Sequence, residues 1–381
     1  MSPHRSPWRK PCAMRAVPAA SGLGFGTLTA VIALGFFALV CLFCKHMAAA
    51  RSIPGNYFPE SRIYGYDLSK LREFRILAEA GHESAPAVSG SVVVWKDFRN
   101  ASWDLSDNHA SIYGKDLSSG REFPIYTGSD RPVKPAISGN TVVWMAINGS
   151  ASSPDIFGKD LQSGRVFSVC TAPGWQDHPA ISGNIVVWDD DRKDLFRHYD
   201  IYGYDLSTRQ EFPICTSDGN HQYPAVSGSI VVWTDDRNKR ATGSDIYGKD
   251  LSTGQELRIC TAPGDQDFPA ISGKIVVWRD WRNKETTGSD IYGYDLSTSR
   301  GFSVCTATGD QEFPAISGDT VVWVDRRKSL VPSICAKDLS TGGESFISGA
   351  KQGQYNPAIS GRIIVWEDWR DRPLRPRTRE Y

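Results

Sequence analysis

The side chains with the clearest capacity for chemistry recur as a Trp-x-Asp-x-Arg motif at six places. These are Trp95-Asp97-Arg99, Trp188-Asp190-Arg192, Trp233-Asp235-Arg237, Trp278-Asp280-Arg282, Trp323-Asp325-Arg327 and Trp366-Asp368-Arg370, while a seventh position reads Trp144, Ala146 and Asn148. An Asp and an Arg two residues apart at a strand end point to one side, where they could bind a carboxylate or a sugar. Six copies cannot all converge on one ligand. We therefore favour a structural role, in which each guanidinium bridges to an Asp further along, at Asp155, Asp200, Asp245 or Asp290.

A second polar set precedes a recurring Pro-Ala-(Ile/Val)-Ser phrase by three residues. Its members are Glu83, Pro132, Gln176, His221, Gln266, Gln311 and Gln354, and beside them lie His82, Trp175, Asp177, His178, Asp267, Phe268, Glu312, Phe313 and Tyr355. Amides, carboxylates and aromatic faces together suit a sugar or a peptide. The predicted binding rim consists of Gln176, His178, His221, Gln266, Gln311, Gln354, Trp175 and Tyr355. The alternative is that these side chains cap backbone groups of their own loops and, with water, fill a channel.

Catalytic and metal-binding patterns are missing from the sequence. His82, His178 and His221 could supply ligands to a transition metal, but they occupy unlike positions in their loops. There is no Ser/His/Asp spacing, no His-Glu-x-x-His, no phosphate-binding loop and no calcium loop. We therefore predict no catalytic residues, no metal site and no cofactor.

Four cysteines recur at one position of the repeat, at Cys170, Cys215, Cys260 and Cys305. Equivalent positions on neighbouring outer strands would lie at least about 12 Å apart, whereas a disulfide needs Cα atoms within about 7 Å. We expect them to be small apolar packing residues that form no disulfides with one another.

All of these residues are positioned by a repeat of about 45 residues. The Pro-Ala-(Ile/Val)-Ser phrase begins at Pro86, Pro135, Pro179, Pro224, Pro269, Pro314 and Pro357, so its intervals are 49, 44, 45, 45, 45 and 43 residues. A second phrase, DIYGYDLS in its fullest form, keeps the same intervals. A period in the forties built from short β-rich segments is typical of a β-propeller, in which each repeat is one blade.

Each repeat predicts four strands. In the repeat from Pro269, PAIS turns at Gly273 into IVVW, whose consecutive apolar residues indicate a strand covered on both faces. DIYGYDL and GFSVCT supply the third and fourth strands. One tryptophan recurs at the end of each second strand as a structural residue, at Trp95, Trp144, Trp188, Trp233, Trp278, Trp323 and Trp366.

The two ends of the repeat region are half units. Residues 61–83 contain only third and fourth strands, and residues 357–370 contain only first and second strands. We predict that they form one composite blade, which closes the ring as a velcro clasp. The fold class is therefore all-β, a seven-bladed propeller of four-stranded blades over residues 61–370, followed by a disordered tail at 371–381.

The N-terminal segment is of another kind. Residues 23–44 are 22 residues without a charge, long enough to cross a membrane as a helix. Basic residues concentrate in residues 1–22, so this region is expected to be cytoplasmic, with residues 45–60 as a linker to an exported propeller. The segment is either a transmembrane anchor or the apolar part of a cleaved signal peptide, with Met14 as a second possible start. The protein is then either membrane-anchored or secreted.

The blade phrases P-A-(I/V)-S-G-x-(I/V)-V-W and D-I-Y-G-x-D-L-S resemble the TolB-type β-propeller repeat, most closely that of cell-surface proteins of archaea and bacteria. The resemblance covers about residues 61–370, although I-S-G replaces the usual W-S-P-D-G. It implies a non-enzymatic binding platform for an envelope protein or glycan. The alternative it implies is a metal-dependent polysaccharide lyase or hydrolase, whose His/Gln cluster is similar in residue types to His178, His221 and Gln266. The formal net charge of zero argues against nucleic acid as a partner, and we expect a monomer.

Overall fold

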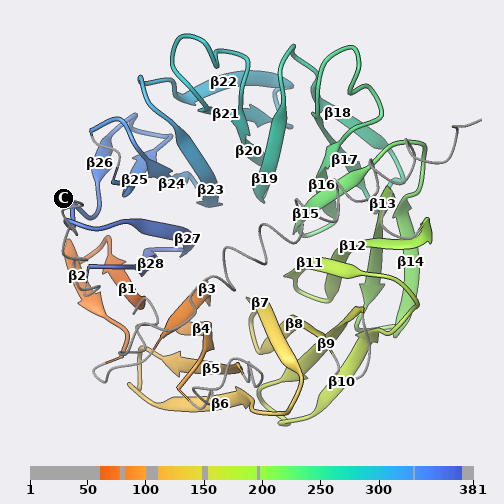
Figure 1. The fold of residues 1–381 in the computed structure, drawn as a ribbon, viewed down its shortest axis with the longest axis vertical. Coiled ribbons are helices and arrows are strands. Elements are labelled where there is room, and N and C mark those ends of the chain that lie inside the picture. The colour runs from red at the N-terminus through yellow and green to blue at the C-terminus, as the bar shows by residue number, and fades with distance from the viewer. Residues whose placement is uncertain are drawn as a thin grey trace, which may run out of the picture. The chain divides into compact units, whose positions relative to one another are not determined.

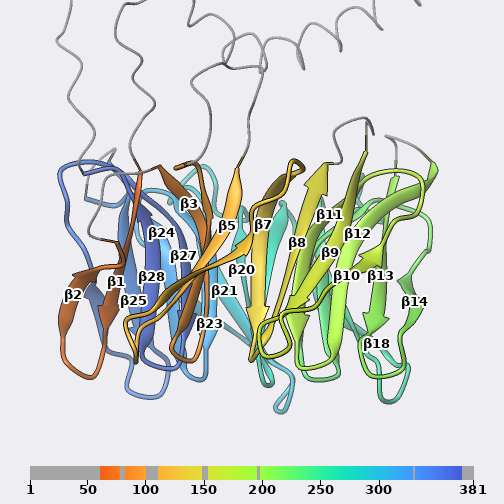
Figure 2. The same ribbon diagram turned by 90° about the horizontal axis from the view of Figure 1, so that it is seen from below.

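A computed structural model describes residues 61–77, 82–99, 110–147, 153–194, 198–328 and 331–370. Within these ranges the chain forms seven antiparallel sheets of four strands each, arranged around a ring (Figure 1). The predicted all-β, seven-bladed propeller is therefore confirmed. Each blade runs outward from a first strand at the centre to a fourth strand at the periphery, and Figure 2 shows the ring from its edge.

The strands of equivalent rank have closely similar bounds in all blades. The innermost strands are β3 (Glu83–Ser89), β7 (Arg131–Ser138), β11 (Gln176–Ser182), β15 (His221–Ser227), β19 (Gln266–Ser272), β23 (Gln311–Ser317) and β27 (Gln354–Ser360). The second strands are β4 (Val92–Asp97), β8 (Thr141–Ile147), β12 (Ile185–Asp194), β16 (Ile230–Asp235), β20 (Ile275–Asp280), β24 (Thr320–Asp325) and β28 (Ile363–Asp368). The third strands are β5 (Ser111–Asp116), β9 (Pro154–Asp160), β13 (His198–Asp205), β17 (Asp245–Asp250), β21 (Asp290–Asp295), β25 (Ser333–Asp338) and β1 (Arg62–Asp67). The outermost strands are β6 (Glu122–Tyr126), β10 (Val166–Cys170), β14 (Gln210–Cys215), β18 (Glu256–Cys260), β22 (Arg300–Cys305), β26 (Glu344–Phe346) and β2 (Arg72–Arg75).

The core lies between neighbouring blades. Val276 and Val277 are fully buried on opposite faces of β20, which explains why its apolar residues are consecutive. All seven repeat tryptophans are buried, with at most 2% of their surface exposed. Trp188, for example, packs in one cluster with Val143 and Ile156 of the preceding blade. The tryptophans thus have the structural role predicted for them.

The chain ends form one blade in the order β2-β1-β28-β27. Strands β1 and β28 pair antiparallel over six residue pairs, with Tyr64 opposite Trp366. The predicted velcro closure is therefore confirmed. One boundary differs, because Glu83 begins β3 of the next blade and Gln354 begins the first strand of the composite blade. Six of the first strands start three residues before their prolines and β7 starts four residues before Pro135, so the polar set that begins with Glu83 lies on strands and not on loops.

The predictions for residues 1–60 and for the tail at 371–381 fall outside the described residues. Within the described part, the chain has no helix of the length and apolarity needed to span a membrane.

Candidate functional site on the innermost strands

Each innermost strand carries a bulge at the residue before its proline. All seven of these residues have φ between +49° and +56°: Ala85, Lys134, His178, Tyr223, Phe268, Phe313 and Asn356. The pairing with the second strand is interrupted there, as between Asp267 and Ala270 in β19. A left-handed backbone is unfavourable for residues other than glycine, and the following proline restricts it further. A bulge re-aims its side chain, so the repeat places seven side chains at equivalent positions around the axis.

Four consecutive bulge residues carry rings that contact one another. His178 and Tyr223 have ring centroids 4.4 Å apart, and Tyr223 and Phe268 have centroids 4.3 Å apart. Phe268 and Phe313 follow at 5.1 Å. Equivalent side chains of neighbouring blades can touch only where the first strands converge, around the central axis (Figure 1). We call these four residues the aromatic arc. Each is partly exposed, so the arc presents rings to solvent.

Charged side chains flank the aromatic arc at both ends. Lys134 places Nζ 2.8 Å from Asp177 Oδ1 and 2.8 Å from His178 Nε2. At the other end, the Arg279 guanidinium lies over the Phe268 ring at 4.7 Å and forms ion pairs with Asp267 and Glu312. The three remaining bulge positions are Asn356, Ala85 and Lys134, so one side of the ring is aromatic and the other is polar or small.

The carboxylate behind the arc is fully buried. Asp189 Oδ2 lies 2.9 Å from His178 Nδ1 and accepts a hydrogen bond from the Tyr223 backbone N–H at 3.0 Å. Burial raises the pKa of the Asp189 carboxyl, although the neighbouring His178 opposes that shift. This contact fixes the orientation of the His178 ring, so one end of the arc is held in place.

The predicted binding rim divides into two groups in the structure. Gln176, His221, Gln266, Gln311 and Gln354 are fully buried. Gln266 Nε2 donates to the carbonyls of Ala262 and Gly264 at 3.1 and 2.6 Å. Gln354 Oε1 accepts from the Ile334 N–H at 3.2 Å. These contacts correspond to the capping role that we weighed as the alternative.

The other predicted rim residues are partly exposed. His178 belongs to the aromatic arc. Trp175 precedes the residues of the arc in the sequence, and Tyr355 follows them. The Tyr355 ring packs against Trp369, with centroids 5.5 Å apart. The three residues compared above with a lyase cluster, His178, His221 and Gln266, have separate sets of partners.

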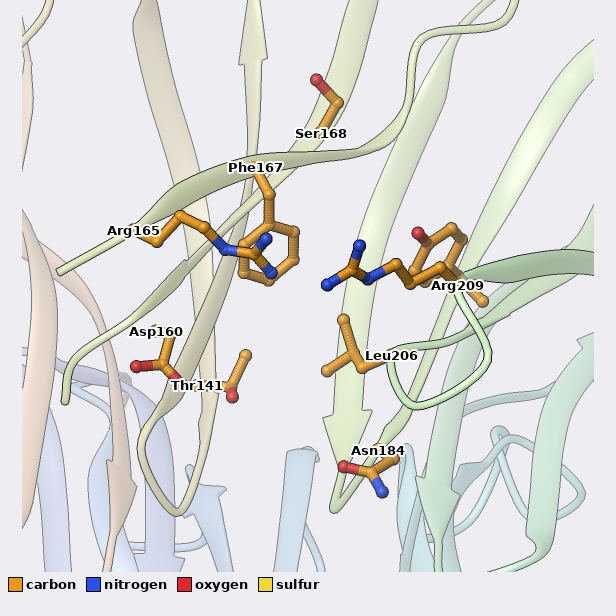
Figure 3. Close-up of a pocket in the computed structure, with 9 residues that line it drawn as sticks. Thr141, Asp160, Arg165, Phe167, Ser168, Asn184, Leu206 and Arg209 are labelled. Carbon is orange, nitrogen blue, oxygen red and sulfur yellow. The ribbon is translucent and has the colours of Figure 1, made fainter. Parts of the chain in front are cut away.

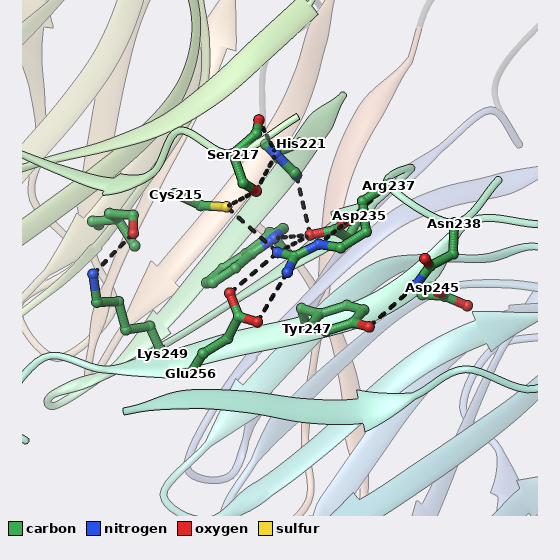
Figure 4. A network of polar contacts seen from close by, with 12 residues as sticks. Cys215, Ser217, His221, Asp235, Arg237, Asn238, Asp245, Tyr247, Lys249 and Glu256 are labelled. Atoms are coloured by element: carbon green, nitrogen blue, oxygen red, sulfur yellow. Dashed lines mark hydrogen bonds and ion pairs between the residues drawn. The ribbon is translucent and has the colours of Figure 1, made fainter. Parts of the chain in front are cut away.

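The Trp-x-Asp-x-Arg motifs form clasps within and between blades. Asp235 accepts hydrogen bonds from the Trp233 indole and from Nε and Nη2 of Arg237, and Figure 4 shows Asp235 beside Arg237. Arg237 also pairs with Glu256 on the outer strand and stacks over the Tyr247 ring at 4.3 Å. The structural role is as predicted, but the partner is Glu256 and not Asp245. Asp245 instead accepts hydrogen bonds from the side chains of Asn238 and Thr242, which lie in the loop before β17.

The sequence reasoning missed a cluster around Cys215. Cys215, His221 and Asp235 have ligand atoms within 4.8 Å of one another, and all three are buried. The Arg237 guanidinium would repel a metal ion at this place, because its Nη2 donates to Asp235 and lies 3.7 Å from the Cys215 sulfur. The signal was present in the sequence, because His221 stands where the adjoining repeats have glutamine. The four repeat cysteines all have free thiols, as predicted.

A hollow lies between two neighbouring blades. Figure 3 shows Arg165 and Arg209 pointing toward one another across it, above Thr141 and Leu206. None of its nine lining residues is buried. It therefore lacks the enclosed polar group expected of a specific site.

Solved structures with the same architecture are numerous. A TolB structure from Agrobacterium tumefaciens has a TM-score of 0.50 and 15% sequence identity, covering 81% of this chain and 97% of its own. The chain is structurally similar to TolB-like seven-bladed propellers. The propeller domain of the Trilobed protease from Pyrococcus furiosus has a TM-score of 0.60 and 14% identity, covering 78% of this chain and 92% of its own. That domain has an open velcro topology, whereas here β1 pairs with β28.

The TolB-like architecture also occurs in enzymes. An oligogalacturonate lyase in complex with manganese has a TM-score of 0.53 and 12% identity, covering 69% of this chain and 78% of its own. At such identities the likeness establishes the fold alone. No protein-family model and no curated protein matches the sequence. Function must therefore be argued from the site.

Proposed function

We propose that this protein is a non-enzymatic binding platform for a protein or glycan partner, and that the partner docks at the aromatic arc on the innermost strands. The observation that carries the proposal is the aromatic arc, His178, Tyr223, Phe268 and Phe313, which is partly exposed and flanked by Lys134 and Arg279. Partly exposed aromatic rings beside oriented polar groups are the usual composition of sites for sugars and peptides.

The geometry favours binding over chemistry. Among the described residues, the side chains best placed for proton transfer or nucleophilic attack are those of the Cys215 cluster, and His221 and Asp235 there are fully buried. The arc itself offers His178, whose Nδ1 is engaged by Asp189 and whose Nε2 is engaged by Lys134. A metal-dependent lyase or hydrolase is thus not supported by the arrangement of His178, His221 and Gln266.

The location of the partner in the cell is inferred from the sequence alone. Residues 23–44 predict a membrane anchor or a signal segment that exports the propeller. We accordingly infer a partner in the cell envelope. Fusion of a reporter enzyme to the propeller, assayed on both sides of the membrane, tests this location.

The binding proposal is tested with a glycan array and with peptides derived from envelope proteins identified by proximity labelling. Each hit is then titrated against the purified propeller. Replacing Tyr223 and Phe268 by alanine should weaken binding by at least about tenfold, because each buried aromatic contact contributes about 1 kcal/mol or more. The control is Leu71→Ala, since Leu71 is the most exposed large apolar residue of the described part, at 75%. Equal affinities for wild type and the Tyr223/Phe268 variant would refute the site.

A further inference from the structure

Four cysteines occupy one structural position at successive seams between blades. Each ends an outer strand, and each sulfur faces the guanidinium of the following blade's Trp-x-Asp-x-Arg motif. The Nη2–Sγ distances are 3.1 Å for Arg192–Cys170, 3.7 Å for Arg237–Cys215, 3.3 Å for Arg282–Cys260 and 2.8 Å for Arg327–Cys305. The protein thus contains four nearly isostructural thiols, and differences among them can be assigned to the few residues that differ nearby.

Two such differences meet at Cys215. The residue two positions after the cysteine is Ser217, where the other three seams have Ala172, Ala262 and Ala307. The residue six positions after it is His221, where the others have Gln176, Gln266 and Gln311. Ser217 Oγ lies 3.4 Å from the Cys215 sulfur and 3.3 Å from His221 Nε2. Of the two departures from the repeat, Ser217 therefore contacts the thiol directly, and His221 contacts Ser217 and has a ring nitrogen within 4.8 Å of the sulfur (Figure 4).

The His221 ring lies beside two oxygen atoms. Nε2 lies 3.1 Å from the backbone carbonyl oxygen of Ser217, and Nδ1 lies 3.1 Å from Asp235 Oδ2, an ion-pair distance without the geometry of a hydrogen bond. A carboxylate this close to the ring favours the positively charged imidazolium. Burial opposes that charge, but the Asp235 carboxylate and the thiol raise the pKa of His221 to about 10.

The four thiols then differ in acidity. Burial raises the pKa of the Cys170, Cys260 and Cys305 thiols, and the pKa of Cys170 is raised to about 12. Burial acts on Cys215 in the same direction, but hydrogen bonding and charge from His221, together with Ser217, lower the pKa of its thiol. The imidazolium and the Arg237 guanidinium are the positive charges near this sulfur, and both pair with the Asp235 carboxylate, while Arg237 also pairs with Glu256.

We propose that Cys215 is an activated thiol, held as a thiolate by His221, Ser217 and Arg237, and that it is the site at which hydroperoxides modify this protein. The thiolate attacks one peroxide oxygen as the O–O bond breaks. With hydrogen peroxide, the attacked oxygen stays on the sulfur as S–OH and the other oxygen leaves as hydroxide, which takes a proton to become water; the sulfur is thereby oxidised by two electrons to a sulfenic acid. The proposal is independent of binding at the aromatic arc.

Exposure alone predicts the opposite preference. Cys215 is buried, with 6% of its surface exposed, whereas Cys260 is only partly buried and is therefore more accessible to solvent. A water-sized oxidant that reacts by access would therefore modify Cys260 first. Reaction by thiolate character would modify Cys215 first, because the thiolate is the nucleophile. The two cysteines form a matched pair within a single chain.

The experiment exposes the folded protein to hydrogen peroxide with a sulfenic-acid trapping reagent and quantifies each cysteine by mass spectrometry. A parallel series uses iodoacetamide. At pH 7 we expect Cys215 to react at least about tenfold faster than Cys260. Between pH 6 and 8 its rate should be nearly flat, while the rates of Cys260 and Cys305 should rise by about tenfold per pH unit, since they remain thiols. Equal rates, or equal pH slopes, would overturn the proposal.

Two variants separate activation from packing. His221→Gln installs the residue of the neighbouring seams, so the fold is expected to tolerate it, and the Cys215 rate should fall to that of Cys260 with the same steep pH slope. Gln266→His combined with Ala262→Ser should raise the Cys260 rate by at least about tenfold. A His221→Gln protein with the wild-type rate and pH profile at Cys215 would show that the imidazole does not activate the thiol.

Discussion

The backbone N–H of Gly90 donates a hydrogen bond to Ser360 Oγ over 3.0 Å, although the two residues are 270 positions apart. An equivalent hydrogen bond joins each of the six remaining pairs of neighbouring blades. In each, a glycine N–H donates to a serine Oγ: Gly139 to Ser89, Gly183 to Ser138, Gly228 to Ser182, Gly273 to Ser227, Gly318 to Ser272 and Gly361 to Ser317. The contact next to the composite blade is chemically the same as the six others. The ring is therefore continuous, and its closure depends on the composite blade.

A chain that lacks residues 61–77 should lose cooperative folding. Without β1 and β2, strand β28 loses the partner that pairs with it over six residue pairs, and Trp366 loses its cover from Tyr64, whose ring is 6.4 Å away. An exposed edge next to a buried tryptophan also favours aggregation. We expect the truncated propeller to be insoluble or to melt well below the full-length protein, as measured by circular dichroism.

Adding the missing segment as a peptide should restore the fold. A peptide of residues 61–77 can supply Ile63 and the ladder of β1, and it should recover soluble protein with the wild-type melting profile. The matched control peptide carries Ile63→Asp, because Ile63 is fully buried. A truncated protein that melts like wild type without any peptide would contradict the role of the velcro blade.

The Trp-x-Asp-x-Arg clasp should contribute measurably through its indole hydrogen bond. Trp188 Nε1 donates to Asp190 Oδ2 at 3.0 Å, whereas Trp144 Nε1 is buried without a hydrogen-bond partner because Ala146 replaces the aspartate. Both rings are fully buried, so Trp→Phe costs similar packing at either position. We expect Trp188→Phe to lower the free energy of unfolding by about 2 kcal/mol more than Trp144→Phe. Equal losses in urea denaturation would show that the indole bond contributes nothing.

The repeat period made the architecture predictable from the sequence, whereas the partners of individual side chains were harder to predict. The intervals between Pro86 and Pro357 give the blade number directly, and the half units at the two ends give the closure. The partner of Arg237 could not be derived in this way. Asp245 and Glu256 are both acidic and near in sequence, and only the register that aligns β17 with β18 places Glu256 within 2.9 Å of the guanidinium.

The predicted rim and the aromatic arc share the innermost strands, but the glutamines of the predicted rim are fully buried. A regular strand alternates sides, so Gln266 and Phe268 would share a face. The bulge at Phe268 breaks this relation, since it shifts the pairing between Asp267 and Ala270. Gln266 is then fully buried, whereas Phe268 is partly exposed. Propensity and periodicity carry no signal for such a bulge, although the proline that follows it in every blade marks its place.

The bulge backbone should be strained at Ala85 and relieved by glycine. Ala85 has φ +49° and precedes Pro86, and it is partly exposed. A left-handed residue other than glycine costs about 1–2 kcal/mol, which exceeds the entropic cost of glycine in a strand, about 0.5–1 kcal/mol. Ala85→Gly is expected to stabilise the protein by about 0.5–1 kcal/mol.

The control for this substitution lies two residues away. Ala87 is on the same strand, without a positive φ, and pairs regularly with Val94. Ala87→Gly should therefore destabilise the protein by about 1 kcal/mol. If both glycine variants lose stability equally in chemical denaturation, the positive φ at the bulge carries no strain.

Glu83 should make the protein less stable as the pH rises. It occupies the position held by Gln354 and three other glutamines, it is 1% exposed, and its Oε2 accepts from the Ile63 N–H at 3.1 Å. Burial raises the pKa of the Glu83 carboxyl to about 7, against the opposing influence of that hydrogen bond and of Arg62. Because this folded-state pKa lies above the ordinary value of 4.5, the folded protein holds the proton more tightly than the unfolded chain. The resulting stability is complete below pH 4.5 and is lost as the pH rises through about 7.

Glu83→Gln should remove this dependence, since glutamine keeps the acceptor for Ile63 and cannot ionise. We expect the variant to match wild type near pH 4 and to exceed it by about 3 kcal/mol at pH 8, corresponding to a shift of roughly 2.5 pH units at 1.36 kcal/mol per unit. Urea denaturation at a series of pH values measures the difference. The converse variant, Gln354→Glu, places a carboxyl near Asp368, which lies 3.2 Å from the Gln354 amide. It should therefore acquire the same pH dependence. A constant difference between Glu83→Gln and wild type from pH 4 to 8 would mean that folding does not change the pKa of Glu83.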